Sequence, residues 1–222
     1  MDAAVVADRI APYRRRLRRI VWLSLHPRRI PGRFRGRGRE REKQRRRLLR
    51  LLPKGAVCAE IGTWRGDFAG AILIHRRPKQ LYLVDPWEHR SEEQYEQAKF
   101  GGSQSGQEAM DALYESVVER FRPQIDSGQV LVKRARSVDA AASFSDESLD
   151  WVYIDGDHGY EAVKRDLEAY YRVVKSGGFI AGDDYGATNG WFGDGVTRAV
   201  DEFAARCADV TIIGSQFLLT KP

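Results

Sequence analysis

The chain has 222 residues, which is long enough for one α/β domain with a modest extension but short for two independent domains. Hydrophobic residues make up 42% and aromatic residues 10% of the chain, which excludes a disordered protein and predicts a packed core. The net charge of +6 is unevenly divided. Residues 1–54 hold 19 Lys/Arg and 4 Asp/Glu, a net charge of +15, whereas the other 168 residues hold 18 Lys/Arg and 27 Asp/Glu, a net charge of −9.

The first 54 residues are expected to form a basic helical arm. An amphipathic helix is predicted from about Pro12 to Ser24, where apolar residues recur at three- and four-residue spacing. Residues 27–38 hold two prolines and three glycines and predict a flexible linker, and a second helix is expected from about Glu40 to Leu52. The arm could contact an anionic membrane or nucleic acid, with strong salt dependence, or pack on the core or on a second subunit of a homodimer.

Cysteine content and hydropathy suggest the compartment. Cys58 and Cys207 form neither a disulfide framework nor a CxxC zinc pair. The longest apolar run near the start, Ile20–Leu25, is too short for a secretion signal or a membrane span. A reduced, cytoplasmic protein is therefore expected.

After Gly55 the pattern alternates between strand and helix, which predicts a mostly parallel sheet covered by helices on both faces. Only three residues separate the last two predicted strands, so these should form an antiparallel hairpin. The domain is expected to span residues 55–222. Its predicted strands are Ala56–Thr63, Gln80–Trp87, Val130–Ala135, Leu149–Asp157, Gly178–Asp184, Val210–Ile213 and Phe217–Thr220, and its predicted helices are Asp67–His75, Gln107–Arg120, Tyr160–Val174 and Val196–Cys207.

The first predicted strand ends in a glycine-containing turn, Glu60-Ile61-Gly62-Thr63-Trp64-Arg65-Gly66. A dinucleotide-binding fingerprint would need glycines where Glu60 and Arg65 stand, and no Gly-Lys-Ser/Thr follows as in a phosphate-binding P-loop. The pattern Glu-x-Gly-x-x-x-Gly instead resembles motif I of class I methyltransferases, the loop that wraps the methionine part of S-adenosylmethionine. The resemblance implies that this cofactor binds at Glu60, Gly62, Thr63, Trp64 and Gly66.

Two further positions fit the same cofactor. Asp85 closes the second predicted strand, 23 residues after Gly62, where a carboxylate can accept hydrogen bonds from a ribose diol. Alternatively, Asp85 is only a turn residue before Pro86. Ser137 follows the third strand, where related enzymes contact adenine, mostly through backbone atoms.

The segments Leu149–Tyr160 and Ser176–Tyr185 resemble the fourth and fifth strands of small O-methyltransferases. The similar enzymes methylate macrolide sugars, as macrocin and mycinamicin O-methyltransferases do, or mycobacterial sugars and methylmannose polysaccharide. The resemblance covers about residues 55–222 and implies a Rossmann-like class I methyltransferase fold with a seven-stranded sheet.

In the family that it resembles, acidic and polar residues that end the fourth and fifth strands bind a divalent metal. The matching residues are Asp155, Asp183 and Asp184, and Asp155 also borders the cofactor. Three carboxylates at the ends of adjacent strands suit Mg²⁺, although such aspartates can also cap helices or stay solvated.

His158 is the predicted general base because its ordinary pKa lies near neutrality, and a metal-bound carboxylate, such as that of Asp155, is the alternative base. It could instead merely hydrogen-bond the turn. The long irregular stretch 88–106 is interpreted as a substrate lid or a disordered insertion, and Tyr185 and Trp191 are candidates to line the acceptor pocket.

The sequence therefore predicts a Mg²⁺-dependent, S-adenosylmethionine-dependent O-methyltransferase in polysaccharide or sugar biosynthesis. A catechol- or phenol-type O-methyltransferase would use the same metal ligands and stays an alternative. Nucleic-acid methylation is less favoured, because the acidic core has no Asn-Pro-Pro-Tyr-like motif. The alternative without enzymatic activity is a membrane-binding protein, in which the amphipathic helix of the arm lies on anionic lipid and the core has no catalytic role.

Overall fold

The computed structural model describes residues 35–101, 106–188, 190–207 and 209–222. The first predicted helix, near Pro12–Ser24, lies outside these residues. The chain divides into two compact units, residues 1–40 and 41–222, and the description of packing and of the site concerns the second unit.

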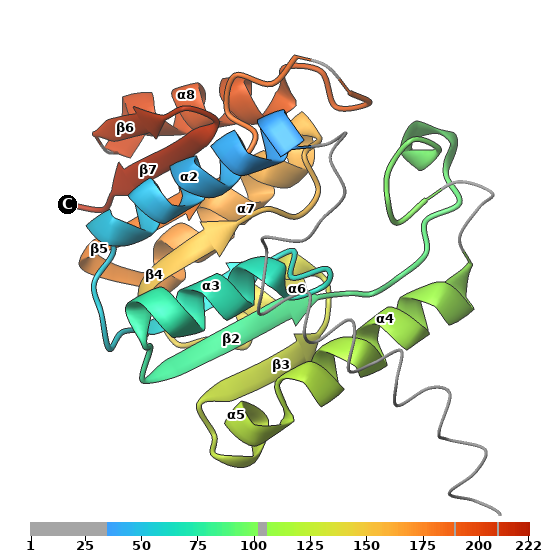
Figure 1. Cartoon of the computed structure of the whole chain (residues 1–222). Helices are drawn as coiled ribbons and strands as arrows, with labels where there is room; N and C mark the ends of the chain where they lie inside the picture. The colour runs from blue at the N-terminus through green and yellow to red at the C-terminus, as the bar shows by residue number, and fades with distance from the viewer. Residues whose placement is uncertain (1–34, 102–105, 189, 208) are drawn as a thin grey trace, which may run out of the picture. The chain divides into compact units, whose positions relative to one another are not determined.

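Seven strands and seven α-helices are found in the described part of the chain (Figure 1). In chain order the elements are α2 (Arg35–Leu51), β1 (Val57–Ile61), α3 (Asp67–Arg76), β2 (Gln80–Asp85), the 3₁₀ turn η2 (Glu93–Tyr95), α4 (Gln107–Arg120), α5 (Arg122–Asp126), β3 (Val130–Arg134), α6 (Ser137–Ala142), β4 (Leu149–Ile154), α7 (Tyr160–Val173), β5 (Val174–Gly182), α8 (Gly195–Cys207), β6 (Val210–Ile213) and β7 (Gln216–Thr220).

The strands form one sheet in the order β3-β2-β1-β4-β5-β7-β6. The first five strands run parallel to one another, whereas β7 pairs antiparallel with both β5 and β6. The order reverses direction at β1 and β4, and such a switch point places the carboxyl ends of neighbouring strands at an open crevice. The predicted Rossmann-like methyltransferase fold with its C-terminal hairpin is confirmed.

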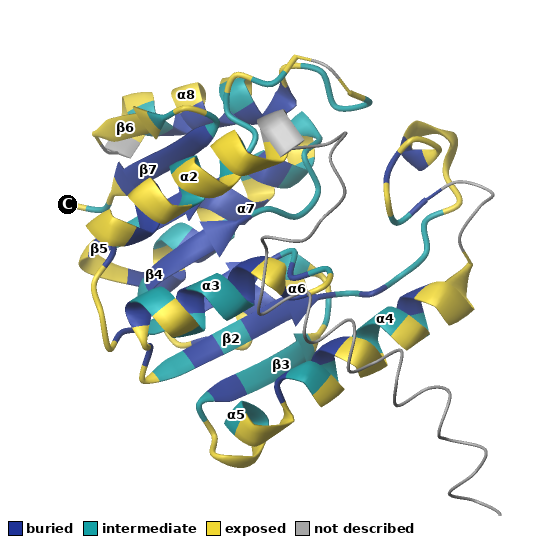
Figure 2. Cartoon of the chain, viewed as in Figure 1, coloured by how far each residue is buried: buried dark blue, intermediate teal, exposed yellow. Residues whose placement is uncertain are grey.

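Helices cover both faces of the sheet, and its central strands are therefore buried on both sides (Figure 2). Alternate residues of β4 show this: Val152 packs in a cluster with α6, α7 and α8, while Trp151 and Tyr153 pack in a second cluster with α2, α3 and α4. Among the described helices, none is long and apolar enough to cross a lipid bilayer.

Helix α2 is anchored in the second cluster. Leu48, Leu49 and Leu52 near its end are 0–2% exposed, and the compact unit that holds the sheet includes the helix from Arg41 onward. The helix starts at Arg35, and residues 35–38, expected to belong to the linker, are helical. Glycine costs a helix only about 1 kcal/mol, so Gly36 and Gly38 do not prevent it.

Candidate active site

The turn after β1 is pressed against the end of β4. Gly62 has a φ of +84°, and a Cβ on it would lie 2.1 Å from the carbonyl oxygen of Asp155. Its amide donates to the carbonyl of Val84 at 2.8 Å, and the amide of Asp155 donates to Ile61 at 2.8 Å. The predicted motif I turn therefore needs glycine at this position, and it brings the ends of β1, β2 and β4 together.

Two polar side chains at this turn are buried without a hydrogen-bond partner among the described residues. They are Glu60, through Oε2, and Thr63, through Oγ1, and both side chains are almost fully buried. Burial raises the pKa of Glu60 well above its ordinary value. Buried polar atoms are rarely left unpaired, so these two acceptors fit a bound ligand that carries hydrogen-bond donors, as the amino group of a methionine moiety does.

Asp85 ties this turn to the end of β2. Its carboxylate accepts hydrogen bonds from the amides of Trp64, at 2.9 Å, and Trp87, at 2.7 Å. Burial raises its pKa and outweighs these two bonds. Asp85 therefore does stabilise the turn, which was the alternative considered for it. A carboxylate that accepts two hydrogen bonds can accept more, and contact of Asp85 with a ribose stays a prediction.

An open cavity of about 290 Å³ lies beyond the ends of β2 and β3. Its lining includes Pro86–Glu88, which directly follow Asp85, and Arg134–Arg136, which directly precede Ser137. The carbonyl of Ser137 accepts a hydrogen bond from Tyr170 at 3.0 Å. Asp85 and Ser137 themselves are not among the lining residues, so their contacts with a nucleoside stay predictions.

Gly66 has a structural reason for being glycine. It precedes α3 with a φ of +71°, and a Cβ on it would lie 2.5 Å from the ring of Phe121. Close packing between α3 and the start of α5 therefore accounts for this residue without a ligand.

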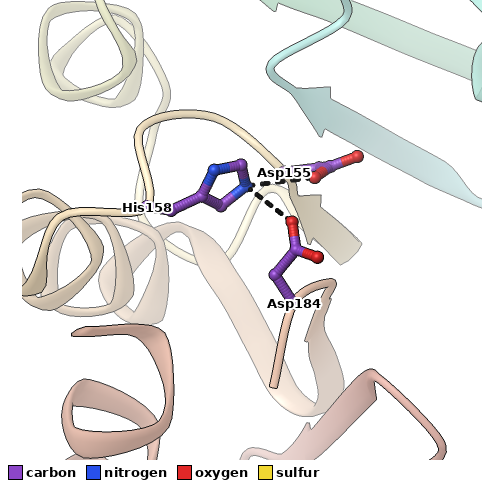
Figure 3. Close-up of side chains that lie close together, drawn as sticks. All are labelled: Asp155, His158 and Asp184. Carbon is purple, nitrogen blue, oxygen red and sulfur yellow. Dashed lines mark hydrogen bonds and ion pairs between the residues drawn. The ribbon is translucent and has the colours of Figure 1, made fainter. Parts of the chain in front are cut away.

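His158 lies between two of the predicted acidic residues. Its Nε2 is 3.3 Å from an oxygen of Asp155 and 3.3 Å from an oxygen of Asp184, as Figure 3 shows. Burial lowers the pKa of His158, but the two carboxylates outweigh burial, so the net shift is upward. These three residues offer ligand atoms within 4.8 Å of one another and form the set, among the described residues, that could hold a metal ion.

Asp183, the third predicted metal ligand, is not part of this set. Its side chain is 0% exposed, and one oxygen accepts from Ser215, Gln216 and the amide of Asp184. Gln216 in turn accepts a hydrogen bond from Tyr153 at 2.7 Å, so Asp183 joins β5 to the C-terminal hairpin and to β4.

Two arginines of α2 contact all three aspartates. Arg41 Nε donates to Asp183 at 2.7 Å and Arg41 Nη2 to Asp184 at 3.0 Å. Arg45 donates to Asp155 and, at 2.6 and 2.9 Å, to Asp183. These charges outweigh burial and hold the pKa of Asp183 below its ordinary value. With the arginines in place, one oxygen of each of the three aspartates already accepts a hydrogen bond from a guanidinium, and Mg²⁺ binding by these residues stays a prediction of the sequence.

The sequence analysis did not single out either arginine, because it treated them as part of a basic arm for which packing on the core was only one of several options. A signal was present: residues 41, 45, 48, 49 and 52 follow the i, i+4, i+7, i+8, i+11 spacing of one helix face. Arg41 and Arg45 continue the buried leucine stripe toward the strand ends.

The predicted lid packs through aromatic residues. Tyr95 is buried and donates to Asp157 at 2.8 Å, and its ring lies 5.1 Å from Trp191 and 5.3 Å from Phe100. Phe192 continues the cluster, 5.6 Å from Trp191 and 4.9 Å from His158. The cluster Tyr95, Phe100, Trp191 and Phe192 thus adjoins the candidate base. Tyr185, the other predicted acceptor residue, instead donates to Asp201 on α8.

The fold has a glycine turn after β1 and polar groups on the ends of β1, β2 and β4. This combination defines a class I methyltransferase architecture. The sequence profile of one family, described as a methyltransferase domain, matches residues 59–185, which is more than half of the chain. The chain belongs to this methyltransferase family.

Solved structures share the fold at low identity. The O-methyltransferase NovP is 18% identical with a TM-score of 0.52, covering 82% of this chain and 79% of NovP. A Staphylococcus aureus protein provisionally named a caffeoyl-CoA O-methyltransferase is 12% identical with a TM-score of 0.56, covering 90% of this chain and 89% of that one.

A shorter match is to the uncharacterised protein R132 of Acanthamoeba polyphaga mimivirus, 49% identical over 37 residues, or 17% of each chain. The chain also spans about half, 46% and 51%, of two further matched structures, from Galdieria sulphuraria and Bacillus subtilis.

Proposed function

We propose that this protein transfers a methyl group from S-adenosylmethionine to a hydroxyl group of a sugar or polysaccharide. The observation that carries the proposal is His158, held between Asp155 and Asp184 at the strand ends beside the Gly62 turn. Membership of the methyltransferase family supports the donor, and the likeness to O-methyltransferases suggests an oxygen acceptor.

The cofactor fits the residues present. Glu60 and Thr63 would accept hydrogen bonds from its methionine part, and Asp85 would accept them from its ribose. S-adenosylmethionine supplies a methyl group already activated on a sulfonium, so the protein has to align the acceptor oxygen and remove its proton.

His158 is the group proposed to take that proton. Asp155 and Asp184 orient its ring and stabilise the positive charge that the ring gains. Because its pKa is raised, the imidazole becomes neutral only above its ordinary range, so turnover should fall as pH decreases through a range above 6.5. The half-buried rings of Phe100, Trp191 and Phe192 would offer aromatic surface for a sugar ring beside it.

The same aromatic cluster also suits a planar phenol, which keeps a catechol-type acceptor as the second candidate. Mg²⁺ dependence stays a prediction of the sequence. Asp155, His158 and Asp184 have the chemistry to hold the ion, but it would have to displace Arg41 and Arg45 from the carboxylates.

Methyl transfer from labelled S-adenosylmethionine by the full chain tests the proposal, with oligosaccharides, catechol and a short RNA as acceptors. We expect labelling of the oligosaccharides. His158→Ala should lower kcat by about 10² to 10⁴ while S-adenosylhomocysteine still binds. The matched control His75→Ala, on α3, should leave turnover unchanged. Labelling of RNA alone, or equal turnover in both histidine variants, would contradict the proposal.

A further inference from the structure

The acidic strand ends already contain their own cations. Asp155, Asp183 and Asp184 bring three carboxylates together, and the Arg41 and Arg45 guanidiniums lie against them at hydrogen-bond distance. His158 contributes a third positive charge when it is protonated. The cluster can therefore reach neutrality with residues of this chain alone.

Arg45 is built into the fold. Its side chain is 21% exposed, and the guanidinium carbon lies 5.0 Å from the ring centre of Phe68 and 5.8 Å from that of Tyr153. One and two helical turns further along the same helix face, Leu48, Leu49 and Leu52 fix α2 in the core. The position of Arg45 is thus set by buried packing.

A guanidinium and a divalent ion would compete for the same atoms. Arg41 and Arg45 both donate to Oδ2 of Asp183, and Oδ2 of Asp155 and of Asp184 each receives one of them. A divalent ion bound through these oxygens would share them with two fixed positive charges. Binding it through the same oxygens without that repulsion would require both arginine side chains to leave, which would uncover the buried carboxylate of Asp183.

We infer that Arg41 and Arg45 are the resident cations of this site, in place of a divalent metal. They donate hydrogen bonds to Asp184 and Asp155 and so fix these side chains around His158, which makes them positioning residues for the base. The inference about the cations stands on geometry alone; only its consequence for catalysis, metal-independent methyl transfer, rests on the proposed function.

The inference can be tested on the full chain by the binding of Mn²⁺ alone. Binding is measured as the loss of the free Mn²⁺ signal in electron paramagnetic resonance. The wild type should show no site tighter than the millimolar range. The double variant Arg41→Ala/Arg45→Ala should gain one site that is at least tenfold tighter, and adding Asp155→Asn should abolish it. The matched control Arg46→Ala/Arg47→Ala removes two exposed charges from the same helix and should behave as the wild type does.

One Mn²⁺ bound per wild-type chain at micromolar affinity and lost in Asp155→Asn would overturn the inference, even if the arginine variants failed to fold. So would a double variant that folds, as judged by a cooperative thermal transition, without a gain in affinity. Arg41→Lys/Arg45→Lys keeps both charges and should not gain the site.

The catalytic consequence has a separate readout. Methyl transfer by the wild type should be equal in EDTA and in Mg²⁺, and a strict requirement for Mg²⁺ would overturn the metal-independent role. Absence of methyl transfer under both conditions would contradict the proposed function, whereas the Mn²⁺ measurements would still decide whether the arginines hold the site.

Discussion

Asp166 on α7 lies buried outside the candidate site, and burial raises its pKa from 3.8 to about 7. The folded state therefore holds this proton more tightly than the unfolded state does. The stability that the group contributes is complete below about pH 4 and is lost as pH rises through 7. A difference of that size corresponds to roughly 4 kcal/mol.

Asp166→Asn should remove that dependence, because an amide does not titrate. We expect the free energy of unfolding, from urea denaturation at pH 5 and pH 8, to fall with pH more steeply in the wild type than in the variant. Equal slopes in both proteins would contradict the assignment. Asp139→Asn on the exposed part of α6 is the matched control and should keep the wild-type slope.

Several site residues could be predicted from sequence because strand ends converge. Asp155, Asp184 and Gly62 end or follow buried strands, and parallel strands deliver such residues to one edge. Arg41 and Arg45 could not be recognised from composition, since a run of arginines is normally solvated. Their roles depend on which helix face packs on the core, and that is a tertiary property.

At the scale of elements, the turn between β1 and α3 depends on one glycine. Gly62→Ala would force a side chain into the left-handed region, at a cost of about 1 to 3 kcal/mol, and would place its Cβ against the Asp155 carbonyl. We expect a lower melting temperature and loss of S-adenosylhomocysteine binding by calorimetry. Gly106→Ala, where nothing lies within 4 Å, is the control and should leave S-adenosylhomocysteine binding unchanged. Unchanged binding in Gly62→Ala would place the cofactor elsewhere.

Periodicity gave the correct type for the strands and longer helices of the core, but the short helices α5 and α6 were not predicted, and element ends were less predictable. The β6 and α4 bounds match the prediction, whereas β5 begins at Val174 instead of Gly178. Lys175–Gly178 has the composition of a turn, yet Val174 pairs with Leu149 across an irregular register, and the amide of Gly177 bonds to Lys221 at 2.9 Å. Pairing with residues that are distant in sequence therefore decides where β5 begins.

At the scale of the whole molecule, the basic N-terminal arm should separate into two parts with different roles. Deleting residues 1–34 should leave a cooperative thermal transition and methyl transfer intact, because the compact unit begins at Arg41. Deleting residues 1–54 should abolish both. It would remove Leu48, Leu49 and Leu52, each worth about 2 to 5 kcal/mol, from a fold whose total stability is typically about 5 to 15 kcal/mol.

Circular dichroism melts and methyl-transfer assays of the two truncated proteins would check this. A folded, active protein lacking residues 1–54 would show that α2 is dispensable. An inactive but folded protein lacking residues 1–34 would assign those residues to the active site or to an essential dimer.

Trp191, in the aromatic cluster that contacts the predicted lid, should report on the lid through its fluorescence. Trp191 stacks edge-on against Tyr95, and Phe100 lies 6.2 Å from it, so movement of the 88–101 segment would change the polarity around one indole. The chain has four other tryptophans, of which Trp87 and Trp151 are 0–1% exposed and should emit at short wavelength. Intrinsic fluorescence, with Trp191→Phe as the blank, can therefore follow acceptor entry in real time without a label.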